Sequence, residues 1–119
     1  MILSQIQKLL SAELICESGK HSVNIESAEA SDLMSDVLAF SPPFSGRNTM
    51  LITGLTNKQV IRTCEIAGVT AIVFVRGKRP TCETIALARQ CGIPLLTTEL
   101  TMFEACGILY SSGLRAAAS

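Results

Sequence analysis

The chain has 119 residues, of which 48% are hydrophobic and only 17% are charged, and its formal net charge is zero. This length fits one domain that buries its core without help from metals or disulfides, and the zero net charge argues against a nucleic-acid binder that neutralises phosphates. A charged fraction below the roughly 25% of an average soluble domain predicts an apolar surface covered by a second copy or a partner.

The N-terminal segment predicts a short helix followed by a strand. Apolar residues recur at helical spacing in Ser4–Leu10, and the strand-like run Ala12–Glu17 ends before Gly19. The opening sequence MILSQIQKLL lacks a basic region followed by a long apolar run and a small-residue cleavage site. It therefore predicts no signal peptide, no membrane span and a cytoplasmic location.

The next segment predicts a strand and a helix. Val23–Glu26 alternates apolar and polar residues, and a helix is expected within Ala30–Phe40, with Ser31 or Asp32 as its cap. Two sets of apolar residues could form the buried face of this helix. One set is Leu33, Val37 and Phe40, and the other is Met34, Val37 and Leu38. The helix cannot continue past residue 41, because two prolines follow.

From Met50 to Tyr110 the sequence repeats one unit three times: a short apolar strand, a tight polar loop and an amphipathic helix. The units are MLIT/GLTNKQVIRTCEIAG, AIVFV/RGKRPTCETIALARQCG and PLLTT/ELTMFEACGILY. Short apolar runs that alternate with helices are typical of parallel strands buried on both faces. We therefore predict a single α/β domain, with a mostly parallel sheet flanked by helices and built from repeated strand-loop-helix units.

Local signals mark the ends of these three helices. Asn57 and Thr81 are in position to cap the first two, which end at Gly68 and Gly92. The last helix begins at Thr101, and its apolar residues at helical spacing are Phe103, Cys106 and Leu109. Residues 113–119 are expected to form a fraying helix end or a mobile tail.

Candidate ligand-binding residues lie where the loops leave the carboxyl ends of the parallel strands. The sequence RGKRP places three cations within four residues, just ahead of a helix start, which favours a phosphate or carboxylate ligand. The alternative is a charged loop that is simply solvated, and threonines beside strands also reflect β-propensity. The full candidate set is Thr53, Thr56, Asn57, Arg76, Gly77, Lys78, Arg79, Thr81, Thr97 and Thr98.

Other patterns exclude several chemistries. No stretch matches a P-loop or GxGxxG, and the acidic residues Glu29, Asp32 and Asp36 lack a partner nucleophile, so we interpret them as solvated charge near a helix start. His21 is interpreted as a surface residue. A metal site is not expected, because the five cysteines have no CxxC spacing and only one histidine accompanies them, and we also expect no disulfide and no cofactor. The five cysteines are expected to be reduced and mostly buried: Cys16, Cys64, Cys82, Cys91 and Cys106.

The run from Leu51 to Tyr110 resembles the DRTGG domain, and the resemblance extends over nearly the whole chain through SDLMSDVLAF. The residues that carry it, in order, are Gly68, Gly77, Pro80, the helix through Glu83 and Ala88, Gly92, Pro94, Phe103 and Glu104. The chain departs from the family at Gly54-Leu55-Thr56-Asn57, where an acidic-basic pair is common, and at Arg76-Gly77-Lys78-Arg79, where a neutral turn is common.

Such domains occur alone, beside CBS pairs in a class of inorganic pyrophosphatases, and ahead of the catalytic domain in some phosphotransacetylases; a related fold precedes the catalytic domain of HPr kinase. The resemblance implies a regulatory or dimerising role without catalysis. We therefore expect a homodimeric, non-enzymatic module that acts with a separate enzyme or signalling protein encoded nearby. The alternative is a sensor that binds a phosphate-containing or nucleotide ligand at the strand carboxyl ends. A transferase or kinase fragment is disfavoured, and neither nucleic acid nor membrane is an expected partner.

Overall fold

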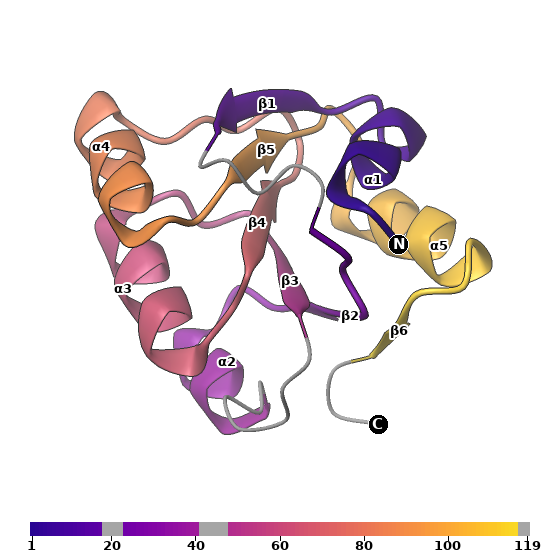
Figure 1. Cartoon of the computed structure of the whole chain (residues 1–119), viewed down its shortest axis with the longest axis horizontal. Coiled ribbons are helices and arrows are strands. Elements are labelled where there is room, and N and C mark those ends of the chain that lie inside the picture. The colour runs from indigo at the N-terminus through magenta and orange to yellow at the C-terminus, as the bar shows by residue number, and fades with distance from the viewer. Residues whose placement is uncertain (18–22, 41–47, 117–119) are drawn as a thin grey trace.

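A six-stranded sheet with the order β1-β5-β4-β3-β2-β6 forms the centre of the molecule (Figure 1). The structure, a computed structural model, describes residues 1–17, 23–40 and 48–116. The strands are β1 (Glu13–Cys16), β2 (Ser27–Ala30), β3 (Thr49–Thr53), β4 (Ala71–Phe74), β5 (Leu95–Thr97) and β6 (Arg115–Ala116). All neighbouring strands pair in parallel except β1, which runs antiparallel to β5. The predicted mostly parallel α/β sheet is confirmed.

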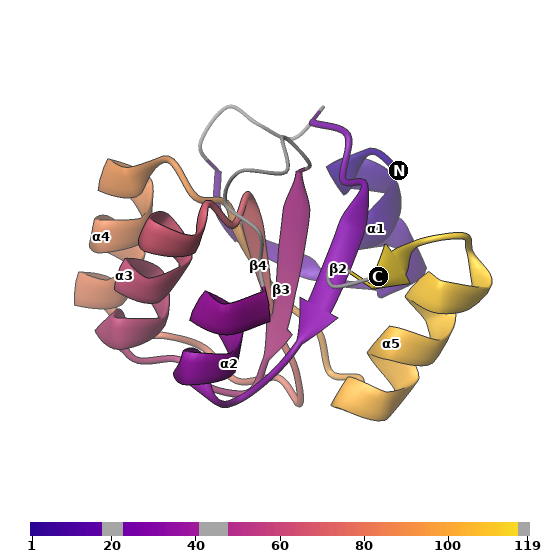
Figure 2. The ribbon, with the colours of Figure 1, turned by 90° about the horizontal axis from the view of Figure 1, so that it is seen from below.

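Five helices cover the two faces of the sheet. They are α1 (Leu3–Leu9), α2 (Met34–Phe40), α3 (Lys58–Ala67), α4 (Cys82–Cys91) and α5 (Met102–Ser111). Helices α2, α3 and α4 pack on one face, whereas α1 and α5 pack on the other (Figure 2). Every residue of β3, β4 and β5 is buried, as their continuous apolar sequences predict.

The side chains of each central strand alternate between two cores, because successive residues point to opposite faces. Leu51 and Ile72 pack beneath α2, α3 and α4, whereas Met50, Ile52 and Val73 pack beneath α1 and α5. The sheet is therefore held between two separate apolar layers.

The predicted helix ends in the repeated units are confirmed. Asn57 and Thr81 accept hydrogen bonds from the third amide of α3 and α4, and Gly68 and Gly92 end these helices with φ of 75° and 72°. Thr101 caps α5 and forms a reciprocal capping box with Glu104. These contacts depend on residues close in sequence, which is why the sequence alone predicts them.

Three of the expected positions are wrong: those of the second strand, of the start of the helix that follows it, and of the C-terminal segment. The second strand is Ser27–Ala30 and not Val23–Glu26, so the following helix begins only at Met34. Arg115 and Ala116 form β6 beside β2, in the segment expected to be a tail. Phe103 is 86% exposed, whereas Ala105 and Leu109 form the buried side of α5. The positions of β2 and β6 are decided by their pairing with strands that lie far away in sequence.

The cysteines are less buried than expected. All five are free, but only Cys16 and Cys64 are buried, whereas Cys82 is exposed. On α2, Met34 and Val37 are buried and Leu38 is exposed, while Leu33 lies just before the helix and is also exposed, so neither predicted face is fully correct. Gly19, His21 and the two prolines after residue 41 lie outside the described residues, as does the side chain of Phe40.

Candidate functional site

The carboxyl ends of β2, β3, β4 and β5 lie at one edge of the sheet, because these strands are parallel. The chain leaves β4 toward α4 on one face and leaves β5 toward α5 on the other (Figure 2). In open α/β sheets, a crevice forms where neighbouring connections diverge in this way, and ligands bind there. The loops 75–81 and 98–101 flank this point.

The loop after β4 is a tight turn fixed to the loop after β5. Arg76 and Gly77 both have positive φ, of 59° and 67°, and the amide of Lys78 donates to the Val75 carbonyl at 3.2 Å, as in a type I′ turn. The amides of Arg76 and Gly77 donate to the carbonyls of Leu100 and Thr98, each at 2.8 Å. These bonds hold the two loops in register.

The carboxylate of Glu99 lies directly against Gly77. A Cβ atom added to Gly77 would come within 2.6 and 2.8 Å of the two Glu99 oxygens. The glycine therefore leaves room for an acidic side chain at the diverging point, and Glu99 belongs to the site although the sequence analysis did not select it.

A second acidic residue, Asp32, joins the ends of β2 and β3. Its Oδ1 accepts from the Thr53 hydroxyl at 2.9 Å and from the Gly54 amide at 2.7 Å. Asp32 is exposed just before α2, as expected for a solvated charge near a helix start, and its carboxylate also fixes the end of β3. Because the sequence analysis placed the strand four residues too early, Asp32 was not recognised as a residue that follows the end of a strand.

The side chain of Lys78 reaches the same corner. Its Nζ and both Asp32 oxygens lie 3.6 Å from the position that a Cβ on Gly54 would occupy. A cation from the loop after β4 and an anion from the loop after β2 thus flank one buried glycine at the end of β3.

The three cations of the RGKRP loop do not converge on a single point. Arg79 Nη2 binds Glu13 on β1 at 2.6 Å, and this hydrogen bond and the Arg79 charge lower the pKa of Glu13. The backbone and side chain of Thr101 lower the pKa of Glu104 by hydrogen bonding, and the Arg76 charge contributes in the same direction. Arg76, Lys78 and Arg79 are therefore each near a different carboxylate.

The candidate threonines of the strands hold the loops in place. The Thr97 hydroxyl donates to the Lys78 carbonyl at 2.8 Å, and the Thr98 hydroxyl donates to the Leu10 carbonyl at 2.7 Å. Together with Thr53, both residues are buried. Their hydroxyl donors are already used within the protein, so these threonines hold the neighbouring backbone in place.

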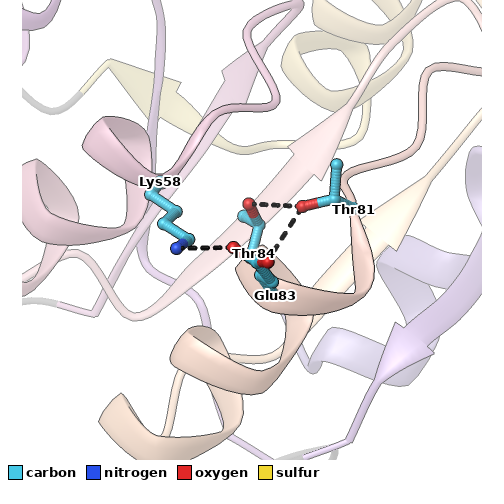
Figure 3. Close-up of polar contacts among 4 residues, drawn as sticks. All are labelled: Lys58, Thr81, Glu83 and Thr84. Atoms are coloured by element: carbon cyan, nitrogen blue, oxygen red, sulfur yellow. Dashed lines mark hydrogen bonds and ion pairs between the residues drawn. The ribbon is translucent and has the colours of Figure 1, made fainter.

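The remaining candidates lie at the starts of α3 and α4. Asn57 Oδ1 accepts from the Val60 amide, and Thr81 Oγ1 accepts from the Thr84 amide at 3.3 Å (Figure 3), while Thr56 is half-buried beside Asn57. Lys58 Nζ binds Glu83 at 2.8 Å and lowers the pKa of that carboxyl by hydrogen bonding and by its charge. The first turn of α4 therefore already carries a negative charge.

The described ranges contain neither a metal-binding cluster of side chains nor a membrane-spanning helix. Residues 1–17, 23–40 and 48–116 contain no group of three or more histidine, cysteine or acidic side chains that could hold a metal ion. Within the same ranges, no helix combines the length and the apolar character needed to cross a bilayer.

Comparison with known proteins identifies a similar fold. No family model and no curated protein matches the chain. Among solved structures, it is similar to the CBS and DRTGG domains of the regulatory region of Clostridium perfringens pyrophosphatase, complexed with the activator diadenosine tetraphosphate. The likeness has a TM-score of 0.74 at 22% sequence identity and covers 93% of this chain and 46% of that one. The chain thus spans about half the length of that regulatory region, whose fold it shares.

Proposed function

We propose that this chain is a non-enzymatic regulatory module that forms a homodimer and acts with a separate enzyme or signalling protein encoded nearby. The observation that carries the proposal is the likeness of 93% of the chain to a regulatory region of a pyrophosphatase. The low charged fraction supports self-association, because it leaves apolar side chains at the surface.

The contacts at the carboxyl edge also favour a role without catalysis. The hydroxyl–carboxylate pair of Thr53 and Asp32 resembles a nucleophile with its base, but Thr53 is 0% exposed and a substrate cannot reach its hydroxyl. Thr97 and Thr98 donate to backbone carbonyls, which are not bases. These side chains stabilise the edge of the sheet.

The regulatory role is tested with the purified chain and the enzymes encoded beside its gene. We expect the activity of one of them to change and to reach a plateau as the concentration of the chain rises. The homodimer is tested separately by light scattering, which should give twice the chain mass of 12.7 kDa. Activities that stay constant at every concentration would reject the regulatory role.

A second candidate function is a sensor of an anionic, phosphate-containing or nucleotide ligand. Arg76 and Lys78 favour it, because both are exposed cations beside the point where the connections after β4 and β5 diverge, the place at which open α/β sheets bind ligands. The similar regulatory region was solved with diadenosine tetraphosphate. Arg79 is not part of this proposed site, since Glu13 holds it toward β1.

Calorimetric titration with diadenosine tetraphosphate, AMP and inorganic phosphate tests the sensor. A charge-assisted hydrogen bond typically contributes about 1.5 to 3 kcal/mol, so Lys78→Ala should weaken binding roughly tenfold or more. Arg79→Ala is the matched control, because it removes the same charge from the same loop at a residue that binds Glu13 on β1 instead. Equal losses in both variants, or no heat with any of the three ligands, would reject this site.

A further inference from the structure

Helix α5 carries apolar residues on its outer side as well as on its inner side. Its sequence, MFEACGILYS, contains one charged residue, Glu104. Ala105 and Leu109 pack into the core, yet Phe103 is 86% exposed and Tyr110 is 64% exposed on the opposite side. A helix that is apolar all round is normally buried on all sides. Figure 1 shows α5 at the periphery, where only its inner side faces the sheet.

Gly107 lies between the two exposed aromatic residues, and the fold of this chain does not require a glycine there. Phe103, Gly107 and Tyr110 have the spacing i, i+4, i+7 and therefore form one stripe along the helix. A Cβ atom added to Gly107 would meet nothing within 4 Å, and no unusual φ is present. A glycine inside a helix costs about 0.5–1 kcal/mol relative to alanine. A backbone that approaches α5 from outside the chain would explain the missing side chain.

An apolar groove adjoins the same stripe. It lies between α5, β2 and β6, has a volume of about 190 Å³, and is lined mainly by Ala28, Ile52, Cys106, Leu109, Tyr110 and Leu114. A cavity of about 150 Å³ lined by aliphatic side chains holds a benzene molecule. The groove therefore has the size and the chemistry to accept one phenyl ring.

We propose that a second copy of this chain docks on this surface, with the two α5 helices antiparallel and crossing at Gly107. A twofold axis near Gly107 brings each Phe103 toward the second copy's Tyr110 and groove, because the two aromatic residues lie on either side of that glycine. The same patch is used by both copies, as a twofold interface requires. This proposal rests on the homodimer of the proposed function, and it names the surface through which the two copies associate.

The size and charge of the patch fit a second copy. At full burial an aromatic side chain covers about 150–250 Å², so four such rings supply at least about half of the ~1,200 Å² that a specific interface needs. Arg115 lies 4.7 Å from the centre of the Tyr110 ring, and Tyr and Arg are common in interface centres. The chain has no net charge that would repel a second copy.

Substitution at Phe103 tests the surface. Phe103→Glu should weaken dimerisation about thirtyfold or more, the effect of losing an interface hot spot, and sedimentation velocity should show monomer at micromolar concentration. The thermal midpoint of the monomer should change little, because the side chain is 86% exposed. Ile66→Glu is the matched control, since Ile66 is 70% exposed on α3, on the other face of the sheet.

A cysteine at the proposed crossing gives an independent readout. Under oxidation in a Cys82→Ser background, which removes the exposed native thiol, Gly107→Cys should form a covalent dimer that is absent from the background protein and from Ile66→Cys under the same conditions. A wild-type monomer would overturn both the homodimer and this interface. A wild-type dimer that survives Phe103→Glu, or Gly107→Cys that forms no more covalent dimer than the controls, would overturn this interface alone and leave the homodimer standing.

Discussion

Gly77 shows how one residue shapes the loop after β4. Its φ of 67° lies in the left-handed region, and a Cβ there would come within 2.6 Å of a Glu99 oxygen. Gly77→Ala should therefore lower the free energy of unfolding by about 1–3 kcal/mol, measured by urea denaturation. Most of this loss of stability should remain in the double variant Gly77→Ala/Glu99→Ala. The exposed Glu99 side chain can move away from an added Cβ in the single variant, so the loss comes mainly from backbone strain at residue 77, which the second substitution does not relieve.

The matched control is Gly54→Ala. Its added Cβ would meet Asp32 and Lys78 at 3.6 Å, an ordinary contact distance, and Gly54 has no positive φ. This variant should change the free energy of unfolding by less than about 1 kcal/mol. Similar losses at the two glycines would contradict the explanation based on backbone conformation.

Cys64 makes the stability of the protein depend on pH in the alkaline range. Burial, with a smaller contribution from the Glu29 carboxylate, raises the pKa of its thiol to about 12 from a usual value of 9.0. The folded state thus keeps a proton that the unfolded state loses, so this contribution to stability is complete below pH 9 and is lost as the pH rises toward 12. In Cys64→Ala, the free energy of unfolding should fall less steeply with pH over this range than in wild type. Equal slopes of the free energy of unfolding against pH in the two proteins would contradict this role of Cys64.

The reactivity of the five cysteines follows from their exposure. At pH 8, Cys16 and Cys64 should not react with a thiol reagent in the native state, whereas Cys82 is exposed at the start of α4 and should react first. Titration should therefore count fewer thiols in native than in denatured protein. Cys82→Ser should remove the fastest phase, and an unchanged fast phase would contradict this order.

At the scale of elements, the caps stabilise the three helices of the repeated units. Thr101→Ala removes the hydroxyl that accepts from the Glu104 amide, and Asn57→Ala removes the oxygen that accepts from the Val60 amide. Each should lower the free energy of unfolding by about 1 kcal/mol. Lys58→Ala is the control, because its ion pair with Glu83 is exposed and should contribute little.

The sequence predicts those elements whose structure depends on nearby residues. Strands β3, β4 and β5 are continuous apolar runs, and their helices carry their own caps and glycines, so periodicity and local chemistry are sufficient. Strand β2 has the sequence SAEA, with little β-propensity, and it is fixed by pairing with β3. Strand β6 has two exposed residues and exists because β2 pairs with it.

The sequence predicted only part of the candidate site. The position of the RGKRP loop at a strand carboxyl end followed from the strand pattern, but the contacts of its cations did not. Glu13 binds Arg79 across 66 positions of sequence, and Asp32 reaches the end of β3 from the loop after β2. Such contacts depend on the order of strands in the sheet, which local patterns do not encode.

In the whole molecule, Leu114 completes the core beneath α1 and α5. Leu114 is 5% exposed and packs with Leu109 and Ile52 in that core, just before β6 pairs with β2. The expectation of a fraying helix end or a mobile tail is therefore wrong for residues 114–116, which are part of the fold.

Leu114→Ala tests this role. It should lower the free energy of unfolding by about 2–5 kcal/mol, because truncation of a buried leucine removes apolar contacts and leaves a cavity. Leu38→Ala is the matched control, since Leu38 is 48% exposed on α2 and the same truncation there should cost much less. Leu114 also lines the groove beside α5, so the variant should weaken self-association as well as folding. Urea denaturation at several protein concentrations separates the two effects, and a cost equal to that of Leu38→Ala would mean that the segment after Gly113 is not part of the core.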